Sequence, residues 1–449
     1  MAKPAIVYVC ADCGAETLKW QGQCPQCARW NTLEQRAVSR RVPAAGAPAA
    51  AVAAPLAEFS AGELARLPTG MAELDRVFGG GLIPGSVTLL GGEPGIGKST
   101  LLLQFADHAA QSIPTLYLSA EESAAQIGVR ARRLGIGTTG LRVVADTDLE
   151  AAMTAARDAG VRLLIVDSIQ TVQLATVGTP AGAITQLKEC TAQLVRFAKT
   201  HGISVVIVGH VTKDGAIAGP RMLEHLVDTV LYFESDVSSR FRNVRATKNR
   251  FGSVGELAFF HMGEQGLREV RNPSAIFLAR APTPAPGSIV TVTRDGRRPL
   301  LVELQALVDR MRFGAPRRVA QGLDSQRVAM LLAVLNRHAG VSLQDHDVFV
   351  NLVGGLEVTE TACDLPVALA LASSLADKAI TQSLVAFGEI GLTGELRPVA
   401  YGEERLREAV KQGFTTALIA KDNAPRVPIE GLKVVAVARV DEALKVALG

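Results

Sequence analysis

The chain has 449 residues, 48% of them hydrophobic, which predicts about three domains with cores of their own and excludes disordered and fibrous classes. Its 47 basic and 44 acidic residues give a net charge of +3, so any surface for a polyanion must be local. Aromatic residues are only 4%, so base stacking is not the expected main mode of nucleic-acid binding. Without an apolar run near the roughly 20 residues of a membrane span, or a signal-peptide core, we expect a cytoplasmic protein that binds no membrane.

The N-terminal segment carries four of the six cysteines, arranged as two C-x-x-C pairs. Two such pairs suit a tetrahedral Zn²⁺ site, and a module this small needs metal to fold. A redox pair is the alternative, but two knuckles favour metal. The predicted zinc ligands are Cys10, Cys13, Cys24 and Cys27. The isolated Cys190 and Cys363 are expected to be packing residues without a disulfide.

Composition divides the chain into domains and linkers. We predict a four-Cys zinc finger at 1–41, an Ala/Pro linker at 42–57, an α/β domain at 58–280, a Pro-rich linker at 281–287 and an α+β domain at 288–449. The predicted fold class is α/β, because short apolar runs alternate with longer Ala- and Leu-rich segments in the second of these domains.

Continuous apolar runs predict strands that are buried on both faces, as in a mainly parallel sheet. In the α/β domain these are 86–90, 115–118, 163–166 and 205–208, with a helix beginning near Ser99. In the C-terminal region the predicted strands are 288–293, 300–304, 348–353 and 385–390, and the predicted helices are 325–338 and 365–376.

The strongest motif begins at Gly92 and fits G-x-x-x-x-G-K-[ST] between a strand and a helix. Its glycines let backbone N–H groups turn toward phosphates, Lys98 reaches the β/γ-phosphates, and the Ser99 hydroxyl is a ligand for Mg²⁺. A Gly-rich turn without ligand would not explain Lys98 and Ser99 at this register. The predicted nucleotide-binding residues of this loop are Gly92, Glu93, Pro94, Gly95, Ile96, Gly97, Lys98, Ser99 and Thr100.

Acidic residues follow two of the predicted strands. Asp167 ends the run 163–166, where a carboxylate can hold Mg²⁺, although an Asp that ends a strand is often only a cap. Glu121 and Glu122 follow the run 115–118, and one of them could activate the attacking water. The alternative for this pair is an acidic first helical turn that the helix dipole stabilises.

Two polar features come later in the ATPase region. His210 follows the strand 205–208 and could sense a γ-phosphate, or it could be an ordinary loop residue. The stretch 214–222 has little apolar pattern and indicates a loop. Between Val237 and Gly255 lie five basic residues and no acidic one, which favours phosphate contacts over a solvated face. They are Arg240, Arg242, Arg245, Lys248 and Arg250.

The four-Cys knuckle, GEPGIGKST, LLIVDS and KNRFG at 248–252 occur in this order, and the chain closely resembles the bacterial RadA (Sms) family of recombination and DNA-repair ATPases over essentially its whole length. KNRFG is the most family-specific of these motifs. The resemblance implies a RecA-like core that uses ATP and assembles into a ring, expected to be a hexamer. It also implies binding of single-stranded and branched DNA, and cooperation with the RecA recombinase in strand exchange.

The resemblance also implies roles for particular residues. Glu121 resembles the catalytic glutamate, with Glu122 in reserve, and His210 resembles the γ-phosphate sensor. Lys248 and Arg250 resemble the pair that reaches the nucleotide of a neighbouring subunit. The segment 212–222 resembles the central DNA-binding loop. The residues predicted to contact nucleic acid are Lys213, Arg221, Arg245, Lys248 and Arg250.

The C-terminal region, especially 348–355 and 385–399, is similar to the proteolytic domain of Lon. That chemistry needs a nucleophilic Ser and a Lys, but Asp364 and Glu403 align near those two positions, so we predict a fold that has lost its dyad and serves as scaffold or DNA-binding surface. The residues that keep proteolysis open are Ser373, Ser374 and Lys378.

Three functions therefore remain to be distinguished. The first is a DNA-dependent ATPase of homologous recombination and repair that drives branch migration, with ATP, Mg²⁺ and Zn²⁺ as cofactors. The second is an ATP-dependent Lon-type protease. The third is a DNA-independent RecA-like signalling ATPase.

Overall fold

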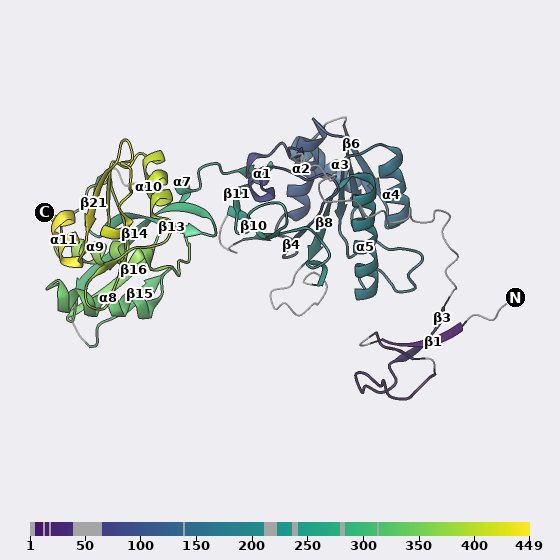
Figure 1. Ribbon diagram of the computed structural model, residues 1–449, viewed down its shortest axis with the longest axis horizontal. Coiled ribbons are helices and arrows are strands. Elements are labelled where there is room, and N and C mark those ends of the chain that lie inside the picture. The colour runs from purple at the N-terminus through teal and green to yellow at the C-terminus, as the bar shows by residue number, and fades with distance from the viewer. Residues whose placement is uncertain are drawn as a thin grey trace, which may run out of the picture. The chain divides into compact units, whose positions relative to one another are not determined.

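The computed structural model of the chain describes residues 5–11, 14–17, 19–38, 65–137, 140–210, 222–235, 241–278, 283–311 and 314–449. These belong to two compact units, Met1–Glu63 and Leu64–Gly449 (Figure 1). The predicted linker 42–57 lies outside the described residues, as does part of the predicted linker 281–287. Across the described ranges, no helix is both long and apolar enough to cross a bilayer.

The first unit contains a small antiparallel sheet of order β2-β1-β3. Its strands are β1 (Ala5–Cys10), β2 (Glu16–Thr17) and β3 (Leu33–Val38). Among the side chains that the structure describes in this unit, the buried core is Cys10, Cys24 and Leu33, which is a small core to set against the chain entropy of folding. Trp20 and Trp30, the two tryptophans of the sequence, have exposed fractions of 58% and 69%. A module built in this way needs a bound metal for its stability.

The second unit begins with a nine-stranded sheet of order β12-β11-β10-β9-β4-β8-β7-β5-β6. The strands are β4 (Val87–Gly92), β5 (Thr115–Ser119), β6 (Leu141–Ala145), β7 (Leu163–Asp167), β8 (Ser204–His210), β9 (Thr229–Glu234), β10 (Phe241–Asn249), β11 (Leu257–Gly263) and β12 (Gly266–Glu269). The strands from β9 to β6 in this order run parallel, so their carboxyl ends meet at one edge.

Helices cover both faces of this sheet. One face packs against α1, α2 and α3, and the other against α4 and α5. The helices are α1 (Ala72–Phe78), α2 (Lys98–Ala110), α3 (Ala124–Leu134), α4 (Leu149–Asp158), α5 (Ile184–His201) and the short α7 (Ser274–Phe277). Helix α3 begins with a capping box in which Ser123 and Gln126 bond each other's backbone N–H groups. This is the doubly covered parallel arrangement that the apolar strands predict.

The sheet also adds to what the sequence predicts. The apolar strands predict a mainly parallel sheet, and the structure extends it with β10, β11 and β12, which run antiparallel. The basic run of the sequence forms much of β10, in which Val244 and Ala246 are buried and charged residues alternate with them. Strand β10 therefore has one face in the core and one polar face, which the sequence suggests only weakly.

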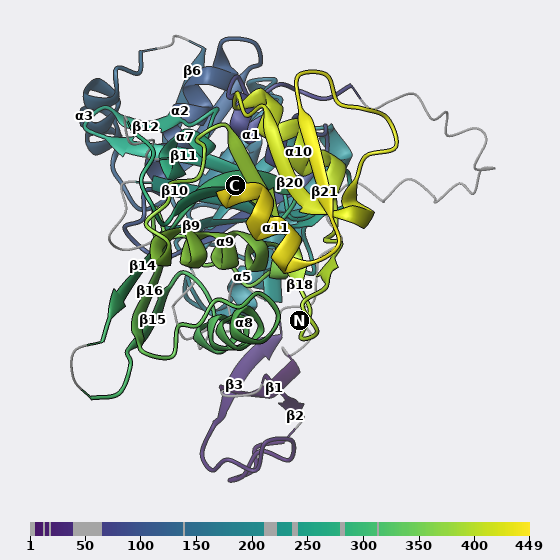
Figure 2. The same ribbon diagram turned by 90° about the vertical axis from the view of Figure 1, so that its left-hand side faces the viewer.

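The C-terminal part contains a seven-stranded mixed sheet of order β15-β16-β14-β13-β17-β20-β21 (Figure 2). Its strands are β13 (Ser288–Asp295), β14 (Arg298–Arg310), β15 (Arg318–Gln321), β16 (His346–Leu352), β17 (Leu384–Phe387), β20 (Thr416–Ala420) and β21 (Lys433–Val437); β18 (Glu389–Ile390) and β19 (Leu396–Arg397) pair separately. The helices are α8 (Ser325–His338), α9 (Asp364–Leu375), α10 (Gly402–Lys411) and α11 (Val440–Leu448), with 3-10 turns η2 (Thr361–Cys363) and η3 (Lys421–Asn423).

The predicted C-terminal elements are all present, with one strand divided. The predicted strand 385–390 is interrupted at Gly388, so that β17 and β18 belong to different sheets. Helix α9 is buried around nearly its whole circumference, which explains the apolar run from Leu365 to Ala372. Cys190 and Cys363 are buried thiols without a disulfide, as predicted, and burial raises their pKa values to about 11 and about 12.

A buried ion pair joins the nine-stranded part to the C-terminal sheet. Arg298 on β14 donates to the carboxylate of Glu73 on α1 at 2.5 Å, and their side chains are only 8% and 3% exposed. Arg298 also donates to the carbonyls of Leu257 and Arg271. Because its donors and charge are met within the protein, this arginine contributes a specific connection between the two sheets.

Candidate nucleotide-binding site

The Gly-rich loop lies where the sequence predicts it, between the end of β4 and the start of α2. Gly92 is required sterically, because a Cβ there would lie 2.6 Å from the Phe233 carbonyl oxygen. A Cβ at Gly97 would lie 2.7 Å from the flexible Met262 Cε. Gly97 also has a φ of 113°, which favours glycine. The backbone of this loop therefore forms the kind of cradle that receives phosphates at a helix N-terminus.

Lys98 is the first residue of α2 and folds across this loop. Its Nζ donates to the carbonyl oxygens of Gly92 and Glu93, both at 2.8 Å, and the residue is 3% exposed. Burial lowers the pKa of Lys98 to about 8, although the nearby carboxylates of Asp167 and Glu121 oppose that shift. An anionic ligand in the loop would raise this pKa again and favour the charged form further. Ser99 and Thr100 follow in the first turn, and both are half-buried.

Asp167 ends β7 beside the loop, with its side chain 5% exposed. Its Oδ2 accepts a hydrogen bond of 2.5 Å from the Tyr117 hydroxyl, whereas its Oδ1 is buried and has no hydrogen-bond partner among the described residues. Burial and the charge of Asp167 raise the pKa of Tyr117 well above its usual value, so the hydroxyl remains a donor. A buried carboxylate oxygen without a donor suits a hydrated cation, so these residues fit the Mg²⁺ that accompanies a nucleotide.

Glu121 lies beyond the end of β5, and two side chains from neighbouring strands meet its carboxylate. Its Oε1 accepts a hydrogen bond from the Ser168 hydroxyl at 2.5 Å and lies 3.1 Å from the His210 Nε2. The hydrogen bond from His210 lowers the pKa of Glu121 to about 2, and Ser168 and the charge of Lys98 act in the same direction. Residues that are up to 89 positions apart in the sequence thus form one cluster.

Glu122 faces a different partner. Its carboxylate pairs with Arg130 of α3 at 2.6 Å. The structure therefore brings Glu121 together with His210 and directs Glu122 toward a helix. Of the two candidates, Glu121 is the one that lies in a cluster with Ser168 and His210.

The basic residues of β10 make contacts within the chain. The Lys248 Nζ donates to the carbonyls of Glu224 and Val227 at 2.6 and 2.8 Å, and burial and the neighbouring Arg250 lower the pKa of Lys248. Arg250 lies 3.3 Å from the Asp228 carboxylate. Within the described ranges, none of the hydrogen bonds or ion pairs of Lys248 and Arg250 reaches the phosphate loop of the same chain.

Of the three other residues that were predicted to contact DNA, the structure describes one. Arg245 forms ion pairs with Asp295 at 2.9 Å and Glu234 at 3.3 Å, so its charge is already balanced by two carboxylates. Lys213 and Arg221 lie outside the described residues.

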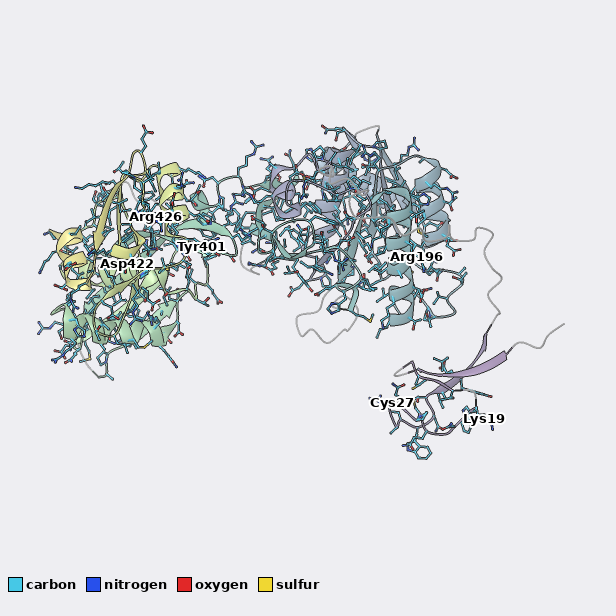
Figure 3. The ribbon with its side chains drawn as sticks, viewed as in Figure 1. Lys19, Cys27, Arg196, Tyr401, Asp422 and Arg426 are labelled. Atoms are coloured by element: carbon cyan, nitrogen blue, oxygen red, sulfur yellow. The ribbon has the colours of Figure 1, made fainter. Side chains whose placement is uncertain are left out.

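Three of the four predicted zinc ligands come together in the first unit. One of them, Cys27, is labelled in Figure 3. The sulfurs of Cys10, Cys24 and Cys27 all lie within 4.8 Å of one another, and those of Cys10 and Cys27 are 3.7 Å apart. Tetrahedral Zn–S bonds of about 2.3 Å place two sulfurs about 3.8 Å apart. Cys13 lies outside the described residues. The donor set and its spacing fit Zn²⁺.

We expect the full-length protein to hold about one zinc per chain, since the buried core of the module is too small to fold it. Elemental analysis after gel filtration measures this. Cys24→Ser should release the zinc and unfold the module while nucleotide binding by the second unit persists, and Cys190→Ser is the matched control with its zinc retained. A full zinc content in Cys24→Ser would refute the assignment.

The C-terminal positions that align with a protease dyad are held by ion pairs. Asp364 is 3% exposed, pairs with Arg327 and accepts a hydrogen bond from the Ile390 N–H. Glu403 is exposed and pairs with Arg407 on the same helix. Neither position carries a nucleophile.

Ser373, Ser374 and Lys378, the residues that could still support proteolysis, each form a hydrogen bond with the backbone. The Ser373 hydroxyl is fully buried, donates to the Lys378 carbonyl and accepts from the Gly287 N–H. The Ser374 hydroxyl accepts from the Val308 N–H. The Lys378 Nζ donates to the carbonyl of Gly449 at 3.1 Å. These contacts tie both hydroxyls to the backbone.

Sequence reasoning missed two contacts of the nucleotide site. Tyr117 donates to Asp167, and Ser168 donates to Glu121. Arg242 of β10 belongs to the basic run that was predicted to contact phosphate, and it donates to the Ile96 carbonyl in the phosphate loop at 3.4 Å. The sequence offered a weak signal for Tyr117, because a tyrosine stands between the two leucines of a buried strand. Ser168 follows Asp167 directly, whereas nothing local points from Arg242 to the loop carbonyl.

Comparison with known proteins connects this geometry with a function. Residues 53–216 match the AAA domain family, residues 8–35 match a rubredoxin metal-binding domain, and residues 319–423 match the subunit ChlI of Mg-chelatase family. The fold is therefore a zinc ribbon, a RecA-like ATPase core and a ChlI/Lon-like domain.

Full-length relatives are also similar. The chain is 50% identical to the DNA repair protein RadA of Pseudomonas aeruginosa and 49% identical to that of Escherichia coli K12, with 99% of each chain covered. It is 44% identical to the DNA repair protein RadA of Bacillus subtilis, with 100% of both chains covered. The matched order of domains thus extends over whole proteins of one kind.

Proposed function

Because the chain belongs to the RadA family of bacterial DNA repair proteins, we propose that it is a DNA-dependent ATPase that binds single-stranded and branched DNA and drives branch migration. At the coarser level, the chain is an ATP hydrolase of DNA recombination and repair, and its cofactors are ATP, Mg²⁺ and Zn²⁺. The observation that supports the proposal best is the cluster of Lys98, Asp167, Glu121 and His210 at the carboxyl edge of the parallel sheet.

Each residue of the cluster has a proposed task. The backbone of 92–97 and Lys98 bind the β/γ-phosphates, and Ser99 and Asp167 hold Mg²⁺. Magnesium supplies charge stabilisation for the leaving phosphate when it is bound. Glu121 orients and polarises the attacking water.

The contact between His210 and Glu121 suggests how phosphate sensing and hydrolysis are connected. A carboxylate with a pKa of about 2 is a weak proton acceptor. If His210 turns to the terminal phosphate, Glu121 loses this hydrogen bond, and its pKa rises toward the ordinary value. In this proposal, Glu121 becomes an effective base only when His210 contacts the terminal phosphate of bound ATP.

The DNA-related part of the proposal rests on the family and on charge. We propose that Lys248 and Arg250 act on the nucleotide of a neighbouring subunit in a hexameric ring, and that Lys213, Arg221 and Arg245 contribute to DNA contacts. The RecA recombinase is the proposed partner, and the cytoplasm the proposed location, because bacterial DNA repair takes place there. Helicase-like movement along single strands would convert hydrolysis into branch migration.

We also propose the domain plan 1–41, 42–57, 58–280, 281–287 and 288–449, with the last domain acting as a scaffold or DNA-binding surface rather than as a protease. The ion pairs at Asp364 and Glu403 support this, since neither residue supplies a nucleophile or an activating amine.

The testing experiment measures ATP hydrolysis with and without single-stranded DNA at two salt concentrations. We expect stimulation by DNA that weakens at higher salt and disappears in Lys98→Ala. The control is Lys188→Ala, which removes an exposed lysine of α5. Turnover that needs Lys98 but ignores DNA would favour the signalling ATPase. Casein cleavage that Ser373→Ala abolishes would favour the protease.

A further inference from the structure

The two carboxylate oxygens of Asp167 have different surroundings. Oδ2 accepts the Tyr117 hydroxyl at 2.5 Å, whereas Oδ1 is buried without a hydrogen-bond partner among the described residues. Leaving a buried carboxylate oxygen unsatisfied costs free energy unless water or a ligand meets it. Oδ2 is therefore held by a hydrogen bond, whereas Oδ1 is available to a ligand.

Tyr117 is itself held rigidly. It lies on β5, beside β7, in a register that places Ser119 opposite Asp167. Its ring is 2% exposed and belongs to the core between the sheet and α2, which includes Leu101 and Leu102. Because the same helix begins with Lys98 and Ser99, the core that locks the ring also supports the phosphate loop. The Tyr117 hydroxyl cannot turn to solvent while the ring stays packed.

We propose that Tyr117 is a positioning residue for the metal side of the nucleotide site. Its hydrogen bond fixes the orientation of the Asp167 carboxylate, so that Oδ1 remains the oxygen presented to Mg²⁺. A group that hydrogen-bonds the oxygen of a metal-binding carboxylate that does not face the metal changes metal affinity in this way. The inference rests on the proposed function, because that function gives Asp167 its metal role.

A purely structural role predicts something different. A buried tyrosine hydroxyl needs an acceptor, and Asp167 could serve only as that acceptor. Removing the hydroxyl would then lower stability by the value of one hydrogen bond and leave cation affinity unchanged. The two explanations therefore differ in how the variant responds to Mg²⁺, not in its stability.

The experiment uses the full-length protein and a fluorescent, non-hydrolysable ATP analogue. Its dissociation constant is measured in EDTA and in Mg²⁺, and the ratio of the two constants gives the magnesium-dependent gain in affinity. We expect Tyr117→Phe to reduce this gain by about tenfold or more. Its affinity in EDTA should stay within about twofold of the wild type, which also shows that the variant is folded.

Two further variants separate the possible failures. Asp167→Asn should lose at least as much of the gain as Tyr117→Phe. Thr191→Val removes a buried hydroxyl that donates to the Leu187 carbonyl within α5, and it should retain the full gain. An unchanged gain in Tyr117→Phe, alongside a loss in Asp167→Asn, overturns the inference alone. An unchanged gain in both overturns the metal role of Asp167, and the inference with it.

Discussion

Glu121→Gln is expected to lower ATP turnover by about 10²- to 10⁴-fold while nucleotide affinity changes little. The glutamine keeps the size of the side chain but removes the charge that accepts hydrogen bonds from Ser168 and His210. The measurement is single-turnover hydrolysis at saturating ATP, together with nucleotide binding. A loss of turnover with retained binding would show that Glu121 acts in hydrolysis and not in nucleotide binding.

Glu122→Gln is the matched control for this prediction. It makes the same chemical change one residue away, but its carboxylate pairs with Arg130 and not with His210. We expect its turnover to stay within about threefold of the wild type, because the Glu122–Arg130 pair is partly exposed and has no contact with His210 or the phosphate loop among those described. If Glu122→Gln lost the activity and Glu121→Gln kept it, the roles of the two acids would have to be exchanged.

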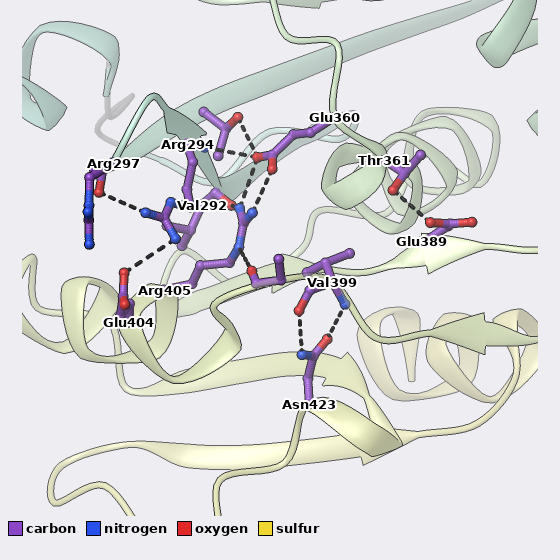
Figure 4. Close-up of polar contacts among 12 residues, drawn as sticks. Val292, Arg294, Arg297, Glu360, Thr361, Glu389, Val399, Glu404, Arg405 and Asn423 are labelled. Atoms are coloured by element: carbon purple, nitrogen blue, oxygen red, sulfur yellow. Dashed lines mark hydrogen bonds and ion pairs between the residues drawn. The ribbon is translucent and has the colours of Figure 1, made fainter. Parts of the chain in front are cut away.

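Arg405→Met is expected to destabilise the C-terminal part of the chain by about 3–5 kcal/mol. Arg405 is 1% exposed, and its guanidinium donates to both oxygens of Glu360 and to the carbonyls of Val292 and Ala400 (Figure 4). Methionine fills a similar volume but leaves the Glu360 carboxylate without its cation. The measurement is the chemical denaturation midpoint, followed by circular dichroism.

The control for this prediction is Arg407→Met, two residues further along α10. Arg407 pairs with Glu403, and the two side chains are 63% and 57% exposed. Its loss should cost about 0.5 kcal/mol or less. Equal effects of the two variants would contradict the importance of the buried pair.

The pH dependence provides a second check on Arg405. Burial alone would raise the pKa of Glu360, but Arg405 and the Thr293 hydroxyl outweigh it, so the pKa is lowered in the folded protein. The stabilising contribution of Glu360 is therefore present above its unfolded pKa of about 4.3 and is lost as the pH falls through the lower folded value. The stability difference between wild type and Arg405→Met should shrink on acidification.

The parts of the fold that could be predicted from the sequence are those governed by local pattern. Strands β4, β5, β7 and β8 are buried on both faces, so their apolar runs identify them without tertiary information. The phosphate loop is likewise local, because its chemistry needs residues at fixed spacing. Strand β10 could not be identified in this way, because its charged residues obscure the buried Val244 and Ala246.

The contacts within the site were less predictable, because they connect residues far apart in the chain. The hydrogen bond from Tyr117 to Asp167 spans 50 positions and that from Ser168 to Glu121 spans 47. The contacts of Lys248 and Arg250 were likewise not predictable from local sequence. Their charge predicts phosphate contacts, but only the folded chain shows that they bond the Glu224–Asp228 turn.

The placement of the two tryptophans has an optical consequence. Both lie in the first unit, so light absorbed selectively by indole is emitted from the zinc module, and Leu64–Gly449 contributes none of that signal. Both rings are already largely exposed to water, so the emission should respond mainly to quenching by neighbouring groups. An unfolding curve recorded through this emission would describe the metal module and would miss the melting of the ATPase altogether.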